Sequence, residues 1–288
     1  MSESLKNKTI KGTFWSAADT FLGQGVSFVV GIVLARLLTP EEYGLIGMCL
    51  IVNAILDGFV DSGFSTSIIR KKDANNDDYN TMFIVNFVIS IFLYIGVFFT
   101  SSFIAEFFKK PELTDLVKVT GVIIIINALS LTQNTILVKR INFKAKTKAS
   151  VISALISGVV GITLAYSGYG VWALVVQMIT RALCNTISLW IINRWLPNLS
   201  FNIQSFKYMW GFGWKLLVSG LLDRVWTEAY QIVVGKFYSP DTLGQYTRSK
   251  HYASLLSTNL NKVVMQVSYP VLSSIQDDEE RMVNSYRL

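Results

Sequence analysis

A polar stripe interrupts an apolar stretch near the middle of the chain. Gln177, Arg181 and Asn185 follow one another at four-residue intervals, so they share one face of a helix. Arginine keeps its charge, and its fork of N–H donors suits bidentate binding of a phosphate or carboxylate. The stripe therefore indicates a polar cavity that binds an anionic group. The alternative is that an acidic side chain of another helix, Asp19 or Asp57, neutralises Arg181.

Acidic side chains also lie within apolar stretches, where a charge is costly and implies a partner or a cavity. Asp57 and Asp61 are one helical turn apart, a spacing at which two carboxylates can share a cation or a proton. The alternative for Asp61 is a place at the cytoplasmic interface, near Arg70. In the first apolar stretch, Asp19 and Gln24 are candidate cavity residues, and Asp19 alternatively pairs with a neighbouring cation.

A later stretch carries polar groups on two faces. Asp223, Thr227 and Gln231 share one face, and Asp223 is a further candidate for carrying a coupling proton or cation. Arg224 and Glu228 lie one turn apart, a spacing that predicts an ion pair within the helix.

Other motifs give no sign of catalysis. The sequence has no Gly-rich phosphate loop with its lysine, no metal-binding His/Cys cluster and no G-x-S-x-G motif, so we expect neither an enzyme nor a cofactor nor a metal site. Cys49 and Cys184 lie in apolar stretches and are expected to be buried thiols. Asn127, Ser130 and Asn134 predict interhelical hydrogen bonds rather than a binding site.

The chain that carries these groups has the composition of a membrane protein. Hydrophobic residues make up 51% of its 288 residues and charged residues only 16%, with a mean hydropathy of +0.43. Soluble domains average about 25% charged residues. The formal net charge of +7 would also suit nucleic-acid binding, so the positions of the basic residues decide between nucleic acid and membrane lipid as the partner.

Eight apolar stretches approach or exceed the roughly 20 residues that a helix needs to cross a bilayer core. They span 13–34, 45–64, 81–104, 116–138, 149–166, 171–192, 214–234 and 252–274. With a cytoplasmic N-terminus, fifteen Lys and Arg lie in the inner connections and six in the outer ones, as the positive-inside rule requires. This bias predicts an all-α integral membrane protein with its N-terminus inside. It also explains the net charge through contacts with anionic lipid headgroups, without nucleic acid.

A short motif recurs 200 positions apart. ARLLTPEEYG at 35–44 is matched by GKFYSPDTLG at 235–244, and each copy joins two apolar stretches. Both contain a hydroxyl residue and a proline that begin a helix, and in the first copy a glutamate completes a capping box. The repeat predicts two parallel lobes: a complete six-helix lobe at 1–192, a linker at 193–213, and the first two helices of a second lobe at 214–288. On this reading the natural protein continues past residue 288.

Several motifs taken together resemble a known family. They are LARLLTPEEYG at 34–44, DSGFS at 61–65, LVKR at 137–140, GYGVWAL at 168–174 and YPVLS at 269–273. With them, essentially the whole chain resembles the bacterial polysaccharide and O-antigen repeat-unit flippases. That family belongs to the multidrug/oligosaccharidyl-lipid/polysaccharide exporter superfamily.

The resemblance implies a fold of 12 to 14 spans in two lobes around a central cavity, of which a truncated part is present here. It implies transport of an undecaprenyl-pyrophosphate-linked oligosaccharide across the bacterial inner membrane, with a polysaccharide polymerase and chain-length machinery as further partners. Arg181, with Gln177 and Asn185, would meet the pyrophosphate or an acidic sugar. The first alternative is an ion-coupled exporter of small molecules or drugs. The second is an integral-membrane glycosyltransferase or polymerase.

Overall fold

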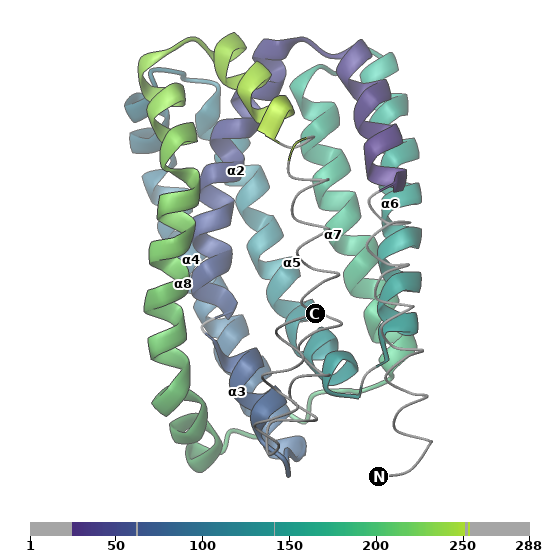
Figure 1. Ribbon diagram of the computed structural model, residues 1–288, viewed down its shortest axis with the longest axis vertical. Helices are drawn as coiled ribbons and strands as arrows, with labels where there is room; N and C mark the ends of the chain where they lie inside the picture. Colours follow the sequence, from purple (N-terminus) through teal and green to yellow (C-terminus); the bar gives the residue numbers. More distant parts are fainter. Residues whose placement is uncertain (1–24, 62, 141, 251–252, 254–288) are drawn as a thin grey trace, which may run out of the picture.

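The computed structural model describes residues 25–61, 63–140, 142–250 and 253. Every regular element in these ranges is a helix that runs roughly along one common axis (Figure 1). The helices are α2 (Pro40–Asp61), α3 (Phe64–Arg70), α4 (Asn76–Phe108), α5 (Leu113–Lys139), α6 (Phe143–Tyr166), α7 (Val171–Asn193) and α8 (Ile203–Phe237), and a helical stretch Gly25–Leu37 precedes them. The predicted stretch 252–274, apart from residue 253, lies outside the described residues, as do Asp19 and Gln24.

Five helical segments are long and apolar enough to cross a membrane, which confirms the prediction of an all-α membrane protein. They correspond to the second to sixth predicted stretches: Pro40–Arg70, Asn76–Phe108, Leu113–Lys139, Phe143–Tyr166 and Val171–Asn193. The 35-residue α8 is not among them, because charged side chains recur along its whole length. The first predicted stretch is described only from Gly25 onward, as the apolar helix Gly25–Leu37.

Both copies of the repeated motif begin a helix as predicted. Glu42 Oε2 accepts a hydrogen bond from Thr39 N at 2.7 Å, and Thr39 Oγ1 accepts one from Glu42 N at 3.3 Å, which completes the capping box. In the second copy Ser239 Oγ accepts from Thr242 N at 3.2 Å. The Thr242 hydroxyl lies 2.9 Å from Ser239 Oγ, in the place that Glu42 takes in the first copy.

The second predicted stretch is broken near its end. Gly63 has φ 69°, in the left-handed region, and separates α2 from the short α3. A Cβ at this position would also lie 2.7 Å from Leu216 Cβ of α8. Glycine is therefore required both by the backbone conformation and by the close approach of α8.

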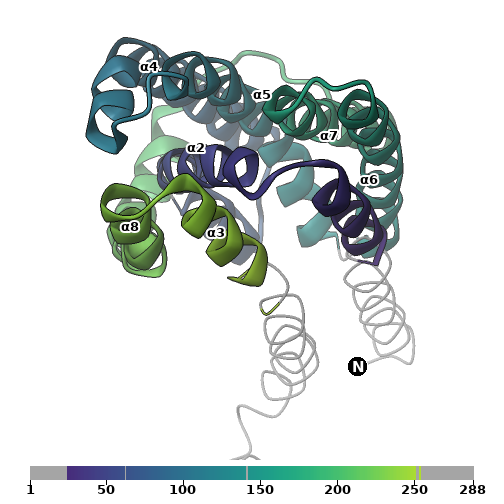
Figure 2. The same cartoon turned by 90° about the horizontal axis from the view of Figure 1, so that it is seen from above.

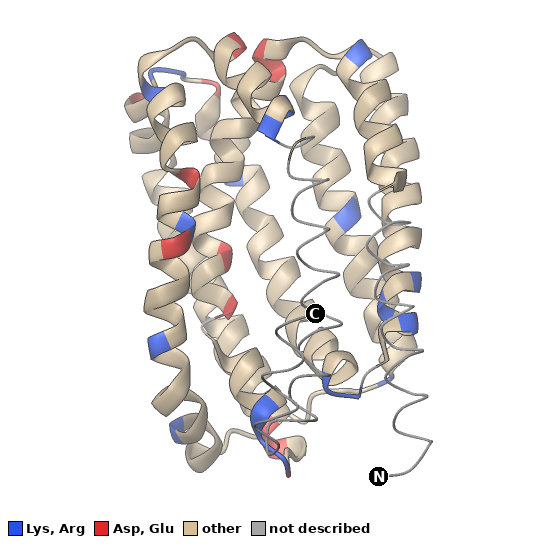
Figure 3. Cartoon of the chain, in the orientation of Figure 1, with Lys and Arg blue, Asp and Glu red and all other residues tan. Residues whose placement is uncertain are grey.

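The helices surround α2. Seen along the helix axes, α4, α5, α7 and α6 follow one another along one side of the bundle, and α2 lies between this row and α8 (Figure 2). The starts of α2, α5 and α7 gather at one end of the bundle, which we call the Pro40 end. The opposite end, where α2 finishes, is the Asp61 end. Charged residues concentrate toward these two ends, with a smaller number along the middle of the helices (Figure 3).

The segment between α7 and α8 is fastened to the bundle. Asn80 Oδ1 of α4 accepts a hydrogen bond from Asn198 N at 3.0 Å, and Thr81 Oγ1 accepts one from Asn202 N at the same distance. From α5, Gln133 Nε2 donates to Trp195 O at 2.8 Å. The helix α8 already begins at Ile203, so the second half of the predicted linker 193–213 is helical.

Candidate functional site

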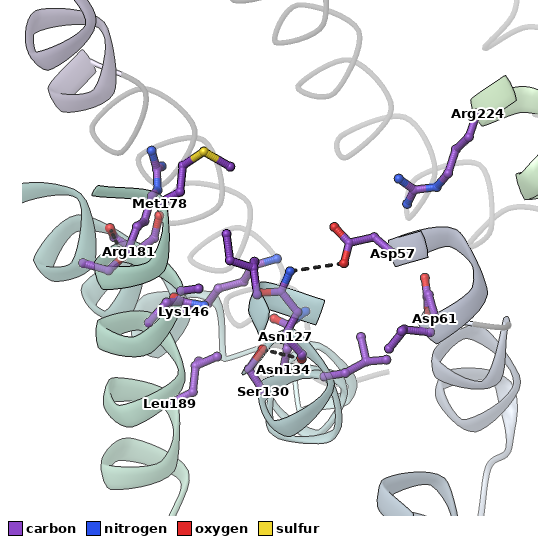
Figure 4. A pocket seen from close by; sticks show the side chains of 17 residues that line it. Asp57, Asp61, Asn127, Ser130, Asn134, Lys146, Met178, Arg181, Leu189 and Arg224 are labelled. Carbon is purple, nitrogen blue, oxygen red and sulfur yellow. Dashed lines mark hydrogen bonds between the residues drawn. The ribbon is translucent and has the colours of Figure 1, made fainter. Parts of the chain in front are cut away.

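A cavity of about 560 Å³ lies among α2, α5, α6, α7 and α8, in the half of the bundle nearer the Asp61 end. Four of the predicted site residues line it together: Asp57, Asp61, Arg181 and Asn185. Its charged groups divide between two opposite walls, with the polar side chains of α5 between them (Figure 4). We call it the inner cavity.

The acidic wall is formed by α2. Asp57 Oδ1 accepts a hydrogen bond from Asn127 Nδ2 of α5 at 3.2 Å, so the interhelical bond predicted for Asn127 is present. Asp61 Oδ1 is buried and has no hydrogen-bond partner among the described residues. Because a buried carboxylate oxygen without a donor is costly, this wall is suited to receive a proton or a cation.

Arg224 of α8 extends toward Asp57 (Figure 4). Its Nη1 donates to Ala54 O of α2 at 3.1 Å. The stem of Arg224 passes over bare backbone, since a Cβ on Gly58 would lie 2.9 Å from Arg224 Cδ. The ion pair predicted between Arg224 and Glu228 is not formed: Glu228 pairs instead with Lys250, at 3.0 Å. Arg224 therefore balances part of the acidic wall.

The cationic wall faces it from α6 and α7. Arg181 and Lys146 lie across the cavity from the two aspartates (Figure 4). Within the described part of the chain, Arg181 makes no hydrogen bond and no ion pair, so the pairing with Asp57 considered from the sequence is not present. A guanidinium that has no counter-ion among the described residues and lines the same cavity as an ammonium group has the chemistry to bind an anionic ligand.

The polar stripe of α7 is shared between two cavities. Asn185 lines the inner cavity, whereas Gln177 lines a second one of about 330 Å³, nearer the Pro40 end. Gln177 packs closely on α6, where a Cβ on Gly161 would lie 2.8 Å from its Cγ. Arg181 and Met178 line both cavities and therefore stand at the boundary between them. We call the second one the outer cavity.

Some predicted site residues do not join this arrangement. Asp223 is exposed on α8 and lines neither cavity, while its neighbour Arg224 lines the inner one. Asp19 and Gln24 lie outside the described residues. The part of the chain that is described holds no group of three or more His, Cys, Asp or Glu able to bind a metal ion.

Sequence reasoning missed the contribution of α6. Lys146, Ser150 and Ser153 all line the inner cavity. Their spacing of four and three residues places them on one helix face, and that stripe was a usable signal. It was hidden because Lys146 lies in the basic connection 139–148, which was expected outside the membrane, whereas Ser150 and Ser153 lie in the predicted stretch 149–166. Another member of the basic connection, Lys139, is structural, because its ammonium group donates to Ile68 O at 3.0 Å and so caps the end of α3.

Together these features define a multi-pass α-helical membrane protein with an internal, charge-lined cavity, and comparison with known proteins agrees. The structure matches that of a multidrug resistance MATE family transporter of the MOP superfamily, solved in an inward-facing conformation. The TM-score is 0.60 at 15% sequence identity, and the match covers 94% of this chain and 65% of the other. The fold is thus that of a MATE transporter.

The sequence relationship is more specific. Residues 33–288 match the family described as polysaccharide biosynthesis protein, and the chain belongs to that family. It is 24% identical over 282 residues to the succinoglycan biosynthesis transport protein ExoT of Rhizobium meliloti (strain 1021). It is 26% identical over 292 residues to the lipopolysaccharide biosynthesis protein WzxC of Escherichia coli (strain K12). These matches cover 98% and 99% of this chain but 57% and 58% of the relatives, so the chain spans under two thirds of their length.

Proposed function

We propose that this protein is a flippase that carries an undecaprenyl-pyrophosphate-linked oligosaccharide across the bacterial inner membrane for surface polysaccharide synthesis. The names of the relatives support transport in polysaccharide biosynthesis. The observation that carries the proposal is the inner cavity, whose guanidinium at Arg181 has no counter-ion among the described residues. A pyrophosphate group supplies the negative charge and the oxygen acceptors that Arg181 and Lys146 lack.

The expected orientation fits loading from the cytoplasm. The excess of Lys and Arg in the connections of one side makes the Asp61 end cytoplasmic and leaves the N-terminus inside. The inner cavity then lies in the half of the bundle nearer the leaflet in which the lipid-linked substrate is assembled. Membrane lipids are partners through the same basic connections, and a polymerase and chain-length machinery take the product on the other side.

The acidic wall is the proposed coupling site. Asp57 and Asp61 are one turn apart, and the buried oxygen of Asp61 has no donor among the described residues. Binding of a proton or a cation there lowers the negative charge opposite Arg181, and so changes the affinity of the cavity for an anion. Asp223, which is exposed on α8, contributes to coupling only if α8 moves. No step of this cycle makes or breaks a covalent bond, so the protein acts without catalysis.

The proposal is tested by genetic replacement. Cells lacking the native gene are given either that gene or its Arg181→Gln form, and surface polysaccharide is measured together with lipid-linked repeat units on the cytoplasmic side. Loss of charge-assisted hydrogen bonds worth about 1.5–3 kcal/mol predicts roughly ten- to hundredfold weaker substrate binding and accumulation of lipid-linked units inside. Arg140→Gln is the matched control, because Arg140 is exposed at the end of α5 and lines neither cavity. Normal polysaccharide in the Arg181→Gln strain contradicts the proposal.

A second candidate is an ion-coupled exporter of small molecules. The acidic wall favours it, because two carboxylates also suit an organic cation. In that case loss of the gene leaves surface polysaccharide unchanged and alters drug sensitivity, and Asp57→Asn has a larger effect on export than Arg181→Gln.

A further inference from the structure

The two copies of the repeated motif meet at the Pro40 end. A Cβ on Gly44 would lie 1.9 Å from Pro240 O, and a Cβ on Gly244 would lie 1.8 Å from Pro40 O. Each glycine therefore lies directly against the backbone of the other copy. This reciprocal contact joins the two copies at the Pro40 end, next to the outer cavity, which Tyr43 and Thr247 also line.

Arg248 bridges the two copies beside this contact. Its Nη2 donates to Leu38 O at 3.0 Å, and its Cζ lies 4.0 Å from the centre of the Tyr43 ring. Its Nε is buried and has no hydrogen-bond partner among the described residues. The equivalent residue 200 positions earlier is Met48, which is 1% exposed in the apolar core. The cation is therefore a feature of one copy only and is not required by the helix packing that the copies share.

The outer cavity carries two guanidinium groups and no acid. Arg181 lies at its boundary with the inner cavity, and Arg248 lines its other side. The described residues around it include no aspartate or glutamate, and neither arginine forms an ion pair within the described part of the chain. Two guanidiniums that line one space and have no acidic partner among the described residues favour an anion with several oxygen acceptors, such as a phosphate-bearing group.

We propose that the outer cavity is a second anion subsite, and that an anion bound there by Arg181 and Arg248 releases the closed contact at the Pro40 end. This inference rests on the proposed function, since the anion is the phosphate-bearing part of the transported lipid. In the structure, Arg248 donates a hydrogen bond to the neutral carbonyl of Leu38 and lies over the aromatic ring of Tyr43. A charged acceptor makes shorter and stronger hydrogen bonds than a carbonyl does, so the anion displaces Leu38 O and Tyr43 as the partners of Arg248. Arrival of substrate is then what frees the outer end to open.

The test follows the Pro40 end with two spin labels. Glu41 and Asp241 are exposed and stand one residue after the prolines of the two copies, so Glu41→Cys and Asp241→Cys are labelled in a background with Cys49→Ala and Cys184→Ala. The 288-residue chain is studied in phosphatidylcholine nanodiscs. The probes are farnesyl pyrophosphate for a lipid-linked source, inorganic pyrophosphate for a free one, and nanodiscs with phosphatidylglycerol for a headgroup.

In the native sequence we expect farnesyl pyrophosphate to bind and to lengthen the distance between the labels. Arg248→Gln should bind it at least about tenfold more weakly, and should show the longer distance even without it. Arg140→Gln is again the matched control and should behave as the native sequence does. A response to inorganic pyrophosphate alone, or to phosphatidylglycerol alone, overturns the assignment of the subsite to the transported lipid.

The outcomes separate this inference from the proposed function. If binding is lost in Arg181→Gln but both binding and distance are unchanged in Arg248→Gln, the proposed function stands and the second subsite is refuted. If none of the three probes binds the native chain, the proposed function and the second subsite are both refuted. If Arg248→Lys restores the short distance without restoring binding, the guanidinium fork is the part that recognises the anion, as the subsite requires.

Discussion

Replacing Gly44 by alanine tests the closed contact at the Pro40 end directly. Its added Cβ would lie 1.9 Å from Pro240 O. Because non-bonded heavy atoms settle at about 3.5 Å, the two helix starts have to separate by roughly 1.6 Å. Both groups in the clash are fixed to the backbone, so no side-chain rotation relieves it. Gly244→Ala has the same consequence, at 1.8 Å from Pro40 O.

We expect Gly44→Ala to leave the bundle folded but to open the Pro40 end. Leu243, which is 0% exposed and packs beside this contact, gives a readout when it is changed to cysteine in the background without Cys49 and Cys184. A membrane-impermeant maleimide added to whole cells should label Leu243→Cys faster when Gly44 is alanine. Surface polysaccharide should fall in the same cells, because the end that we propose to face away from the cytoplasm no longer closes.

The matched control is Gly96→Ala. Gly96 lies inside α4 with no heavy atom within 4 Å of an added Cβ, and alanine favours a helix interior over glycine by about 1 kcal/mol. Gly96→Ala should therefore leave both labelling and polysaccharide unchanged. If Leu243→Cys is labelled no faster with Gly44→Ala than with Gly96→Ala, the added Cβ is accommodated without opening the Pro40 end. That result refutes the reasoning.

Three further predictions follow from single contacts. Gly63→Ala places a Cβ at φ 69° and 2.7 Å from Leu216, so it should lower stability in detergent by at least about 1 kcal/mol, and an unchanged melting temperature would contradict this. Lys139→Met leaves the carbonyls at the end of α3 without their ammonium donor and should lower the stability of the protein by about 1–3 kcal/mol. Lys148 is exposed, so Lys148→Met should leave the stability almost unchanged in the same thermal melt. Asp57→Asn keeps the shape of the acidic wall and removes one of its two carboxylates. Transport in proteoliposomes should therefore persist but respond less to an imposed proton or cation gradient, and a full response would remove Asp57 from coupling.

Much of the helix arrangement could be predicted from apolar length and capping chemistry alone. The stretch 171–192 and the helix α7 (Val171–Asn193) differ by a single residue, because Gly170 directly precedes the first apolar residues and the last apolar residues directly precede Asn193. The stripe on α7 placed Arg181 and Asn185 on a cavity for a similar reason: lipid does not tolerate such a face, so it has to point inward. The break at Gly63 was less visible, since its cause is the approach of Leu216 from a distant part of the chain.

The face that α8 turns toward the cavity could not be predicted in the same way. Charged residues occur all around this helix, so no single stripe stands out, and the sequence favoured Asp223 where the structure brings in Arg224. The decisive contact is on another helix, where bare backbone at Gly58 lets the stem of Arg224 pass. Glu228 likewise finds its partner in Lys250, across a turn of the chain. Such pairings depend on the relative rotation of helices, which helical periodicity does not determine.

The repeated motif links the sequence to the closed end most directly. Two copies of one motif related by an approximate twofold axis make an isologous contact, in which residue i touches j and the equivalent of j touches the equivalent of i. Gly44 on Pro240 and Gly244 on Pro40 follow this rule. An inverted repeat would place the copies at opposite faces of the membrane and could not form this contact. The glycine and proline shared by the two copies are therefore explained by the contact they make with each other. Arg248, just past the second copy, has no such equivalent, because the residue 200 positions earlier is Met48.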